Sequence, residues 1–148
     1  MKFIADVMLG RLAKRLRLLG YDVLYDPAVY DNELIRLSIE QHRLILTRDT
    51  ALAARPLASN HLFINSDLVE EQLEQVLSGS PGDSSPLTRC SRCNAPLASL
   101  PRQEARDVVP PYVFDNHEMF LRCTVCGRIY WRGTHVLRMA EWAGEKNK

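Results

Sequence analysis

Short apolar runs alternate with amphipathic segments along the first 80 residues. The apolar runs lie at 3–5, 21–25, 44–47 and 62–64, and their length and β-branched content predict strands. The segments between and after them predict helices over 11–19, 34–42 and 68–77, and a short helix from Thr50 that stops before Pro56. Strands that alternate with helices predict a parallel sheet with right-handed crossovers and helices on both faces, a three-layer α/β/α domain.

The second half of the chain has a different pattern. Residues 78–86 are rich in Gly, Ser and Pro and predict a linker. We therefore expect a first domain over 1–78, a linker over 79–88, and a second, smaller domain with a C-terminal segment over 89–143. Residues 119–122 and 129–131 predict strands of that second domain. Beyond them, Met139 and Trp142 predict a last helix that packs back on the body.

Composition places the protein among ordinary globular chains. Of its 148 residues, 46% are hydrophobic and 25% are charged, and the net charge is only +1. No strong overall field therefore attracts nucleic acid, and any such interface must come from local clusters of charge. No apolar run approaches the roughly 20 residues that cross a bilayer, and the N-terminus lacks the features of a signal peptide. We expect a cytoplasmic protein that does not bind membranes.

The four cysteines predict a metal site. Cys90 and Cys93 form one CxxC pair, Cys123 and Cys126 form a second, and 29 residues separate the pairs. Each pair suits a tight turn that aims both sulfurs at one point, and four thiolates close a tetrahedral zinc shell without an open position. We therefore expect a structural Zn²⁺ ion in a zinc ribbon that depends on the metal for folding. The alternatives are two disulfides or a redox pair.

Acidic residues of the first domain fall where a parallel sheet would bring them to one edge. Asp6 follows the first strand, Asp31 and Glu33 open the second helix, and Asp49 follows the third strand. Clustered carboxylates repel one another unless a cation neutralises them, and oxygen ligands select Mg²⁺ or Mn²⁺. Such ions activate water at a phosphodiester in nucleases. Alternatively, Asp31 and Asp49 are N-caps, and Glu33 favours the positive end of its helix.

Cations and aromatic residues suggest where a nucleic acid would bind. One face of the first helix is leucine-rich, and cations occupy the rest of it, directly after Asp6. These cations and one beside Asp49 predict contacts with a phosphate backbone, and an aromatic and basic group in the tail suggests a surface for unpaired bases. The candidates are Arg11, Lys14, Arg15, Arg48, Trp131, Arg132 and His135. A solvated helix face and a small ribbon core explain the same residues without RNA.

Several of these motifs, in this order, carry a family resemblance. They are residues 3–13, Leu16 to Asp22, 31–35 (DNELI), 46–49 (LTRD), both cysteine pairs and 130–135 (YWRGTH). Together they resemble the Mut-seven C-terminal RNase family, a branch of the PIN-like nucleases with an appended zinc ribbon. The resemblance implies a PIN-like α/β/α domain, a zinc ribbon and metal-dependent endoribonuclease chemistry.

The resemblance also assigns the acids. Asp6 matches the first-strand acid, Asp31 and Glu33 the second acidic motif, and Asp49 the aspartate of the Thr-x-Asp motif. Many PIN-like domains carry another acid two residues after that aspartate, where this chain has Ala51. Either Asp31 and Glu33 both contribute, or the site is thin in metal ligands.

Two hypotheses of different class follow. The first is a Mg²⁺- or Mn²⁺-dependent endoribonuclease whose zinc ribbon assists RNA binding. The second is a non-catalytic module that binds RNA or a protein partner and has a degenerate PIN-like site. A toxin paired with an antitoxin would share the chemistry of the first hypothesis, and a homo-oligomer is compatible with both.

Overall fold

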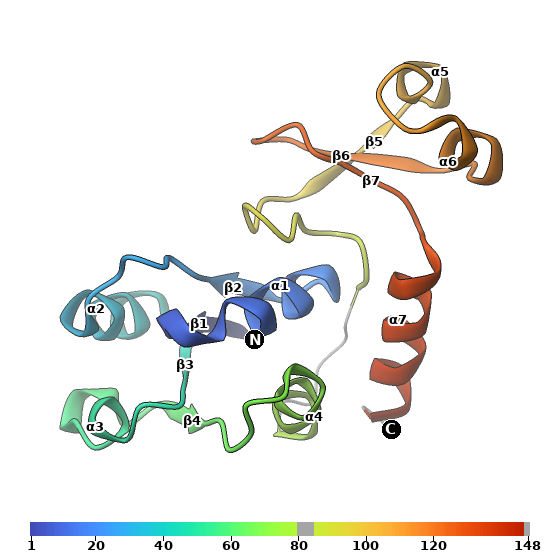
Figure 1. Cartoon of the computed structure of the whole chain (residues 1–148). Coiled ribbons are helices and arrows are strands. Elements are labelled where there is room, and N and C mark those ends of the chain that lie inside the picture. Colours follow the sequence, from blue (N-terminus) through green and yellow to red (C-terminus); the bar gives the residue numbers. More distant parts are fainter. Residues whose placement is uncertain (80–84, 147–148) are drawn as a thin grey trace.

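The computed structural model describes residues 1–79 and 85–146, without the side chains of Thr134, His135 and Lys146. It contains a four-stranded parallel sheet with helices around it and a separate three-stranded antiparallel sheet (Figure 1). A long helix, α7 (Thr134–Lys146), leads from the smaller sheet back to the larger one. Within the described residues, no helix is both long and apolar enough to span a membrane.

The first sheet has the strands and the direction that the sequence predicts. Its members are β1 (Lys2–Ala5), β2 (Asp22–Leu24), β3 (Leu44–Thr47) and β4 (His61–Phe63), in the order β2-β1-β3-β4. All neighbouring pairs are parallel. The two central strands, β1 and β3, therefore end side by side, and the residues that follow them share one edge of the sheet.

The helices between and after these strands also agree with the prediction, apart from one difference in length. They are α1 (Gly10–Leu18), α2 (Asp31–Gln41), α3 (Thr50–Ala53) and α4 (Val69–Gly79). Short 3₁₀ turns precede α1 (η1, Val7–Leu9) and follow α3 (η2, Pro56–Ala58). The third helix is short because Arg55 is extended (φ −71°, ψ 133°), as expected for a residue before proline.

Two apolar clusters on opposite faces of the sheet confirm the three layers. Phe3 and Ala5 of β1 lie in one cluster with residues of α1 and α4, whereas Ile4 lies in the other with residues of α2. Successive side chains of a strand point to opposite faces, so this division is the one expected for a sheet that is buried on both sides.

The smaller sheet frames the cysteine pairs. It consists of β5 (Leu97–Leu100), β6 (Phe120–Cys123) and β7 (Ile129–Tyr130), paired antiparallel. The sequence predicts β6 and β7, but not β5 or the two short helices of the insert, α5 (Arg102–Ala105) and α6 (Pro111–Asn116). These helices cover a small cluster of their own.

Helix α7 joins the first domain. Met139 and Ala143 are buried in the same cluster as Leu73 of α4, and Trp142 packs against it. The prediction that Met139 and Trp142 pack a last helix on the body is confirmed. The second half of the chain thus contributes to the first domain's core.

The chain between the two sheets returns to α1. Residues 80–84 of the predicted linker lie outside the described part. After them, the backbone N–H of Leu87 donates to the carbonyl of Leu18 (3.0 Å), and the Leu87 side chain is buried. Gly20 ends α1 with φ +97°, and a Cβ there would lie 2.3 Å from the Ser85 carbonyl oxygen. Only glycine satisfies both the left-handed backbone and this close approach.

Asp22, at the start of β2, joins the two parts electrostatically. It accepts hydrogen bonds from Arg43 Nη1 (2.8 Å) and from Asn94 Nδ2 (2.7 Å), and Arg89 lies 3.9 Å away. Partial burial opposes ionisation of the carboxyl, but the hydrogen bonds from Arg43 and Asn94 and the nearby arginines outweigh it and lower the pKa of Asp22.

Replacing this carboxylate is expected to destabilise the protein in a pH-dependent way. Because the folded-state pKa of Asp22 lies below its ordinary value of 3.8, its stabilisation is present above that value and is lost as the pH falls through the folded-state pKa. Asp22→Asn should lower the free energy of unfolding by about 1.5–3 kcal/mol at pH 7. The difference from wild type should shrink towards pH 2–3 in urea unfolding. Exposed Asp107→Asn is the control, and a difference independent of pH would contradict the assignment.

Candidate functional site

Asp6 is a buried carboxylate at the edge where the central strands end. It follows β1, and the residue is 3% exposed. Its Oδ1 accepts a hydrogen bond from the N–H of Val7 (2.8 Å), and its Oδ2 accepts one from the Thr47 hydroxyl (2.7 Å). A buried carboxylate is costly unless it is paired or hydrogen-bonded, and these two neutral donors supply no positive charge.

Thr47 connects Asp6 to Asp49. The Thr47 hydroxyl also accepts the N–H of Asp49 (2.9 Å), so one chain of hydrogen bonds runs between the ends of β1 and β3. Asp49 Oδ1 in turn accepts the N–H groups of Ala51 and Leu52, which confirms its interpretation as the N-cap of α3. Thr47 carries no charge and is therefore not among the predicted site residues; the Thr-x-Asp spacing is the sequence signal for it.

The acids of α2 are more exposed. Asp31 is the first helical residue, and its side chain makes no capping bond, so its interpretation as an N-cap is wrong. The Glu33 side chain is 46% exposed and pairs with Arg36, which lowers the pKa of the Glu33 carboxyl. Among the described residues, the only group of three or more candidate metal ligands with mutual distances within 4.8 Å is the four cysteines. The four acids therefore do not converge to that distance.

A cavity of about 180 Å³ lies between the ends of β1 and β2 and helix α2, next to the residue that precedes Asp6. Ala5 and Glu33 line it, and so does Asp26, an acid that follows β2 and accepts the N–H of Ala28 (2.9 Å). Asp26 is not among the acids expected at this edge, although its position directly after a predicted strand is a usable signal. The edge thus offers an acid after β1, β2 and β3.

The predicted RNA-binding cations lie in different surroundings. Arg11 and Lys14 are exposed and line a hollow of about 410 Å³ with the start of α4. Arg15 faces Glu70 across 3.8 Å. The Arg48 guanidinium donates to the carbonyl of Ile64 (3.3 Å), which turns it towards the end of β4.

The predicted aromatic surface is only partly exposed. Trp131 is half-buried and packs against the cluster covered by α5 and α6. Arg132 is exposed, and the side chain of His135 lies outside the described part. Tyr130 is buried, and its hydroxyl lies 3.0 Å from Cys90 Sγ. Tyr130 therefore belongs to the cysteine site and not to a stacking surface.

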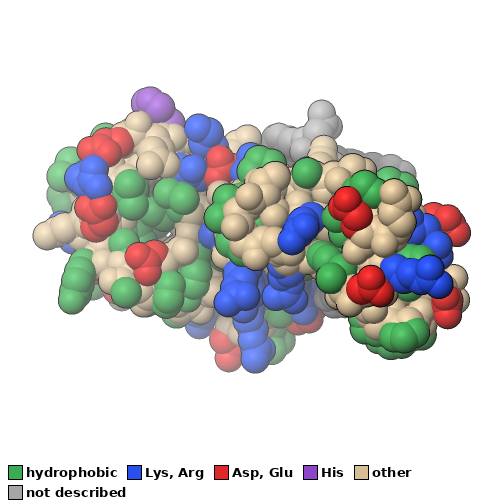
Figure 2. Space-filling view, turned by 90° about the horizontal axis from the view of Figure 1, so that it is seen from above, with side chains coloured by type: hydrophobic (Ala, Val, Ile, Leu, Met, Phe, Trp, Pro, Cys, Tyr) green, Lys and Arg blue, Asp and Glu red, His purple; other side chains and the backbone are tan. Residues whose placement is uncertain are grey.

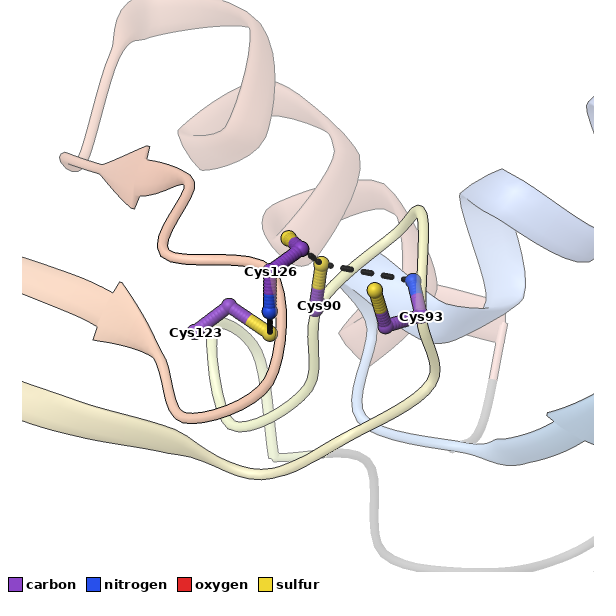
Figure 3. Close-up of side chains that lie close together, drawn as sticks. All are labelled: Cys90, Cys93, Cys123 and Cys126. Carbon is purple, nitrogen blue, oxygen red and sulfur yellow. Dashed lines mark hydrogen bonds between the residues drawn. The ribbon is translucent and has the colours of Figure 1, made fainter.

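The four cysteine sulfurs point towards one another from two tight turns (Figure 3). All are free thiols, their sulfur atoms lie within 4.8 Å of one another, and Cys90 and Cys126 are 3.7 Å apart. Zn–S bonds of about 2.3 Å in a tetrahedron place sulfurs about 3.8 Å apart, whereas a disulfide requires about 2.05 Å. The residues therefore fit a zinc ion, and the geometry does not support the two disulfides.

The turns around the sulfurs suit thiolates. Backbone N–H groups of Cys93 and Cys126 donate to Cys90 Sγ and Cys123 Sγ, both at 3.4 Å. Asn94 and Gly127 follow the two pairs with φ of 66° and 77°, a left-handed backbone conformation that Asn and Gly adopt more readily than other residues. Burial opposes ionisation of Cys90, but hydrogen bonds from Tyr130 and backbone groups outweigh it and lower the pKa of Cys90 to about 7.

Comparison with known proteins identifies the family. Neither the curated proteins nor the solved structures include a match to this chain. The family described as "Mut7-C RNAse domain" matches residues 1–143, which include both sheets, the acids and the cysteine pairs. The protein belongs to the Mut7-C RNAse domain family.

Proposed function

We propose that the protein is a metal-dependent endoribonuclease whose active site is the edge formed by the ends of β1 and β3. The observation that carries this proposal is buried Asp6, hydrogen-bonded through Thr47 to the segment that bears Asp49. Within the described residues Asp6 has no cationic partner, and such a carboxylate at the edge where parallel sheets bind ligands is suited to bind a metal ion. Membership of an RNase family favours RNA as the substrate.

The residues at this edge would have different roles. Asp6 would hold Mg²⁺ or Mn²⁺ with Asp49, and Asp31 and Glu33 would complete the site. The metal would supply an activated water and neutralise charge at the phosphodiester. Glu33 is exposed, and its pairing with Arg36 is a surface contact of small energetic value, so a modest side-chain rotation would release it. Thr47 would fix the orientation of Asp6.

The RNA would cross this edge in contact with cations. Arg11 and Lys14 lie on the helix that begins just beyond Asp6, and both are exposed. The positive charge of the surface is unevenly distributed: Figure 2 shows Lys and Arg side chains gathered near the middle of one face, with acidic side chains scattered around them. Such clusters supply the sequence-independent part of RNA binding despite a net charge near zero.

The ribbon would have a structural role first. Its first cysteine pair contacts the start of β2 through Asn94, at the opposite edge of the sheet from Asp6. Arg132 and His135, with the exposed part of Trp131, are the ribbon residues we propose for assisting RNA binding.

Metal dependence tests the proposal. Zinc-loaded protein in buffers freed of divalent ions should not cleave a mixed pool of single-stranded and structured RNA, and added Mn²⁺ or Mg²⁺ should restore cleavage. Removing divalent ions with a resin, and checking zinc content afterwards, keeps the cysteine site intact. Cleavage at full rate without divalent ions would reject the proposal.

The second candidate, a non-catalytic binding module, is favoured by one observation. The described acids form no group of three within 4.8 Å, and Asp49 Oδ1 is engaged in capping α3. Calorimetric titration with Mn²⁺ separates the candidates. Salt-sensitive RNA binding without any Mn²⁺ binding outside the cysteine site would favour the module.

A further inference from the structure

Arg17 is a buried cation at the junction between α1 and the first cysteine pair. Arg17 belongs to α1 of the first domain, and the residue is only 5% exposed. Nε donates to the carbonyl of Val23 (2.9 Å), and Nη1 donates to the carbonyls of Ser91 (3.1 Å) and Arg92 (3.3 Å). All three partners are neutral carbonyl groups.

A buried guanidinium needs a nearby negative charge to offset the free-energy cost of its burial. Burying a charge costs several kcal/mol unless it is paired. In the described part of the chain, no carboxylate lies within 4.0 Å of Arg17, whereas Arg43, the other buried arginine, has Asp22 at 2.8 Å. Burial lowers the pKa of Arg17, and the groups that oppose this effect most strongly are Cys90 and Cys93, followed by Asp22. These thiols bracket Ser91 and Arg92, whose carbonyls the guanidinium contacts.

The zinc site has the complementary excess of charge. Four thiolates around one Zn²⁺ leave a net double negative charge, and such a centre is stabilised by donors and cations around it. Tyr130 and backbone N–H groups donate to the sulfurs from the ribbon itself. Arg17 supplies the cation from the other domain.

We propose that Arg17 is the counter-charge of the zinc-tetrathiolate centre, so that the centre is completed by a residue of the first domain. Asn94 reinforces the same junction, because its Oδ1 accepts the N–H of Val23 (3.1 Å) and its Nδ2 donates to Asp22 (2.7 Å). This inference rests on zinc being the bound metal and is independent of the ribonuclease activity. Loss of zinc should therefore loosen the end of α1 and the start of β2.

The first test measures zinc retention. Wild type should carry one zinc per chain, and Arg17→Met should release it to a competing chelator dye with an affinity about 10- to 100-fold weaker. Arg17→Lys keeps the charge and should retain zinc better than Arg17→Met. Arg15→Met removes a cation two residues away on the same helix and should change zinc affinity by no more than about twofold. Equal retention by Arg17→Met and wild type would overturn the proposal.

The second test needs no variant. Amide hydrogen exchange is followed in wild type before and after zinc removal. Protection of the Val23 N–H, which is bonded to Asn94, should fall, while that of the Ile64 N–H, which is bonded to Thr47 at the far side of the sheet, should persist. Unchanged protection at Val23 would overturn the proposed coupling between zinc binding and the start of β2. Wild type that binds no zinc would instead overturn the zinc assignment itself, and neither result depends on RNA cleavage.

Discussion

Asp6→Asn is expected to lower RNA cleavage by at least about 100-fold, the scale on which removing one preorganised charge interaction lowers kcat. The amide has the shape of the carboxylate but lacks its charge, so the proposed metal ligand is lost. Folding should be little affected, because the amide can still accept the Val7 N–H and can donate to Thr47. We expect the free energy of unfolding to fall by roughly 1 kcal/mol.

The measurement compares initial rates of cleavage at saturating Mn²⁺, with urea unfolding in parallel. Asp115→Asn, at an exposed aspartate of α6 far along the chain, is the matched control and should retain wild-type activity. If Asp6→Asn does not fold, Thr47→Val is the second probe. This substitution removes the hydroxyl that holds Asp6 and does not change the charge. Full activity in Asp6→Asn would exclude this edge as the active site.

Cys123→Ser is expected to abolish stable zinc binding and to unfold the smaller sheet. Structural zinc in zinc-finger peptides binds with roughly 10–16 kcal/mol. The apolar clusters of the smaller sheet are small and cannot replace that contribution. Cys123 is also the last residue of β6, so its loss removes a ligand and disturbs the central strand of the sheet.

Zinc content, cobalt-thiolate absorption after Co²⁺ exchange, and protease sensitivity of residues 101–118 measure this outcome. Thr124→Ser is the control, since it changes the neighbouring residue but keeps the hydroxyl that donates to Pro96 (3.1 Å). After zinc removal, we expect the purified wild-type protein to have four titratable thiols. A fully folded Cys123→Ser protein without metal would contradict the role of zinc.

Much of the first domain was predictable because its pattern is local. The apolar run at 44–47 is β3 at the same bounds, and the leucines of the first helix enter the core. β5 was not predictable in the same way. Its residues, Leu97–Leu100, show the burial pattern of an edge strand with two exposed positions, and β6 provides the pairing that defines it. Helix α5 is a single turn, which has little signal of its own.

In the candidate site, too, local patterns predict some residues and only the fold brings in others. A strand followed at once by an acid located Asp6, and the cysteine spacing located the four candidate zinc ligands. Asp26 and Thr47 each had a local signal, a position after a predicted strand and the Thr-x-Asp spacing. Only the fold places Asp26 in one cavity with Ala5 and brings the Thr47 hydroxyl to Asp6. The exposed pairing of Glu33 with Arg36 likewise arises from side-chain contacts that motif spacing does not specify.

The first strand and helix of the chain show which features the sequence determines and which the tertiary structure determines. By itself, the sequence determined a strand ending in Asp6 and a helix with leucines on one side and cations on the other, because hydrophobic periodicity and strand ends are properties of neighbouring residues. Only the tertiary structure distinguished those cations. It left Arg11 and Lys14 exposed in a hollow beside the start of α4, and it buried Arg17 against the carbonyls of Ser91 and Arg92, between the first two cysteines. The burial and partners of a charge depend on elements more than 70 residues away, and no local pattern contains them.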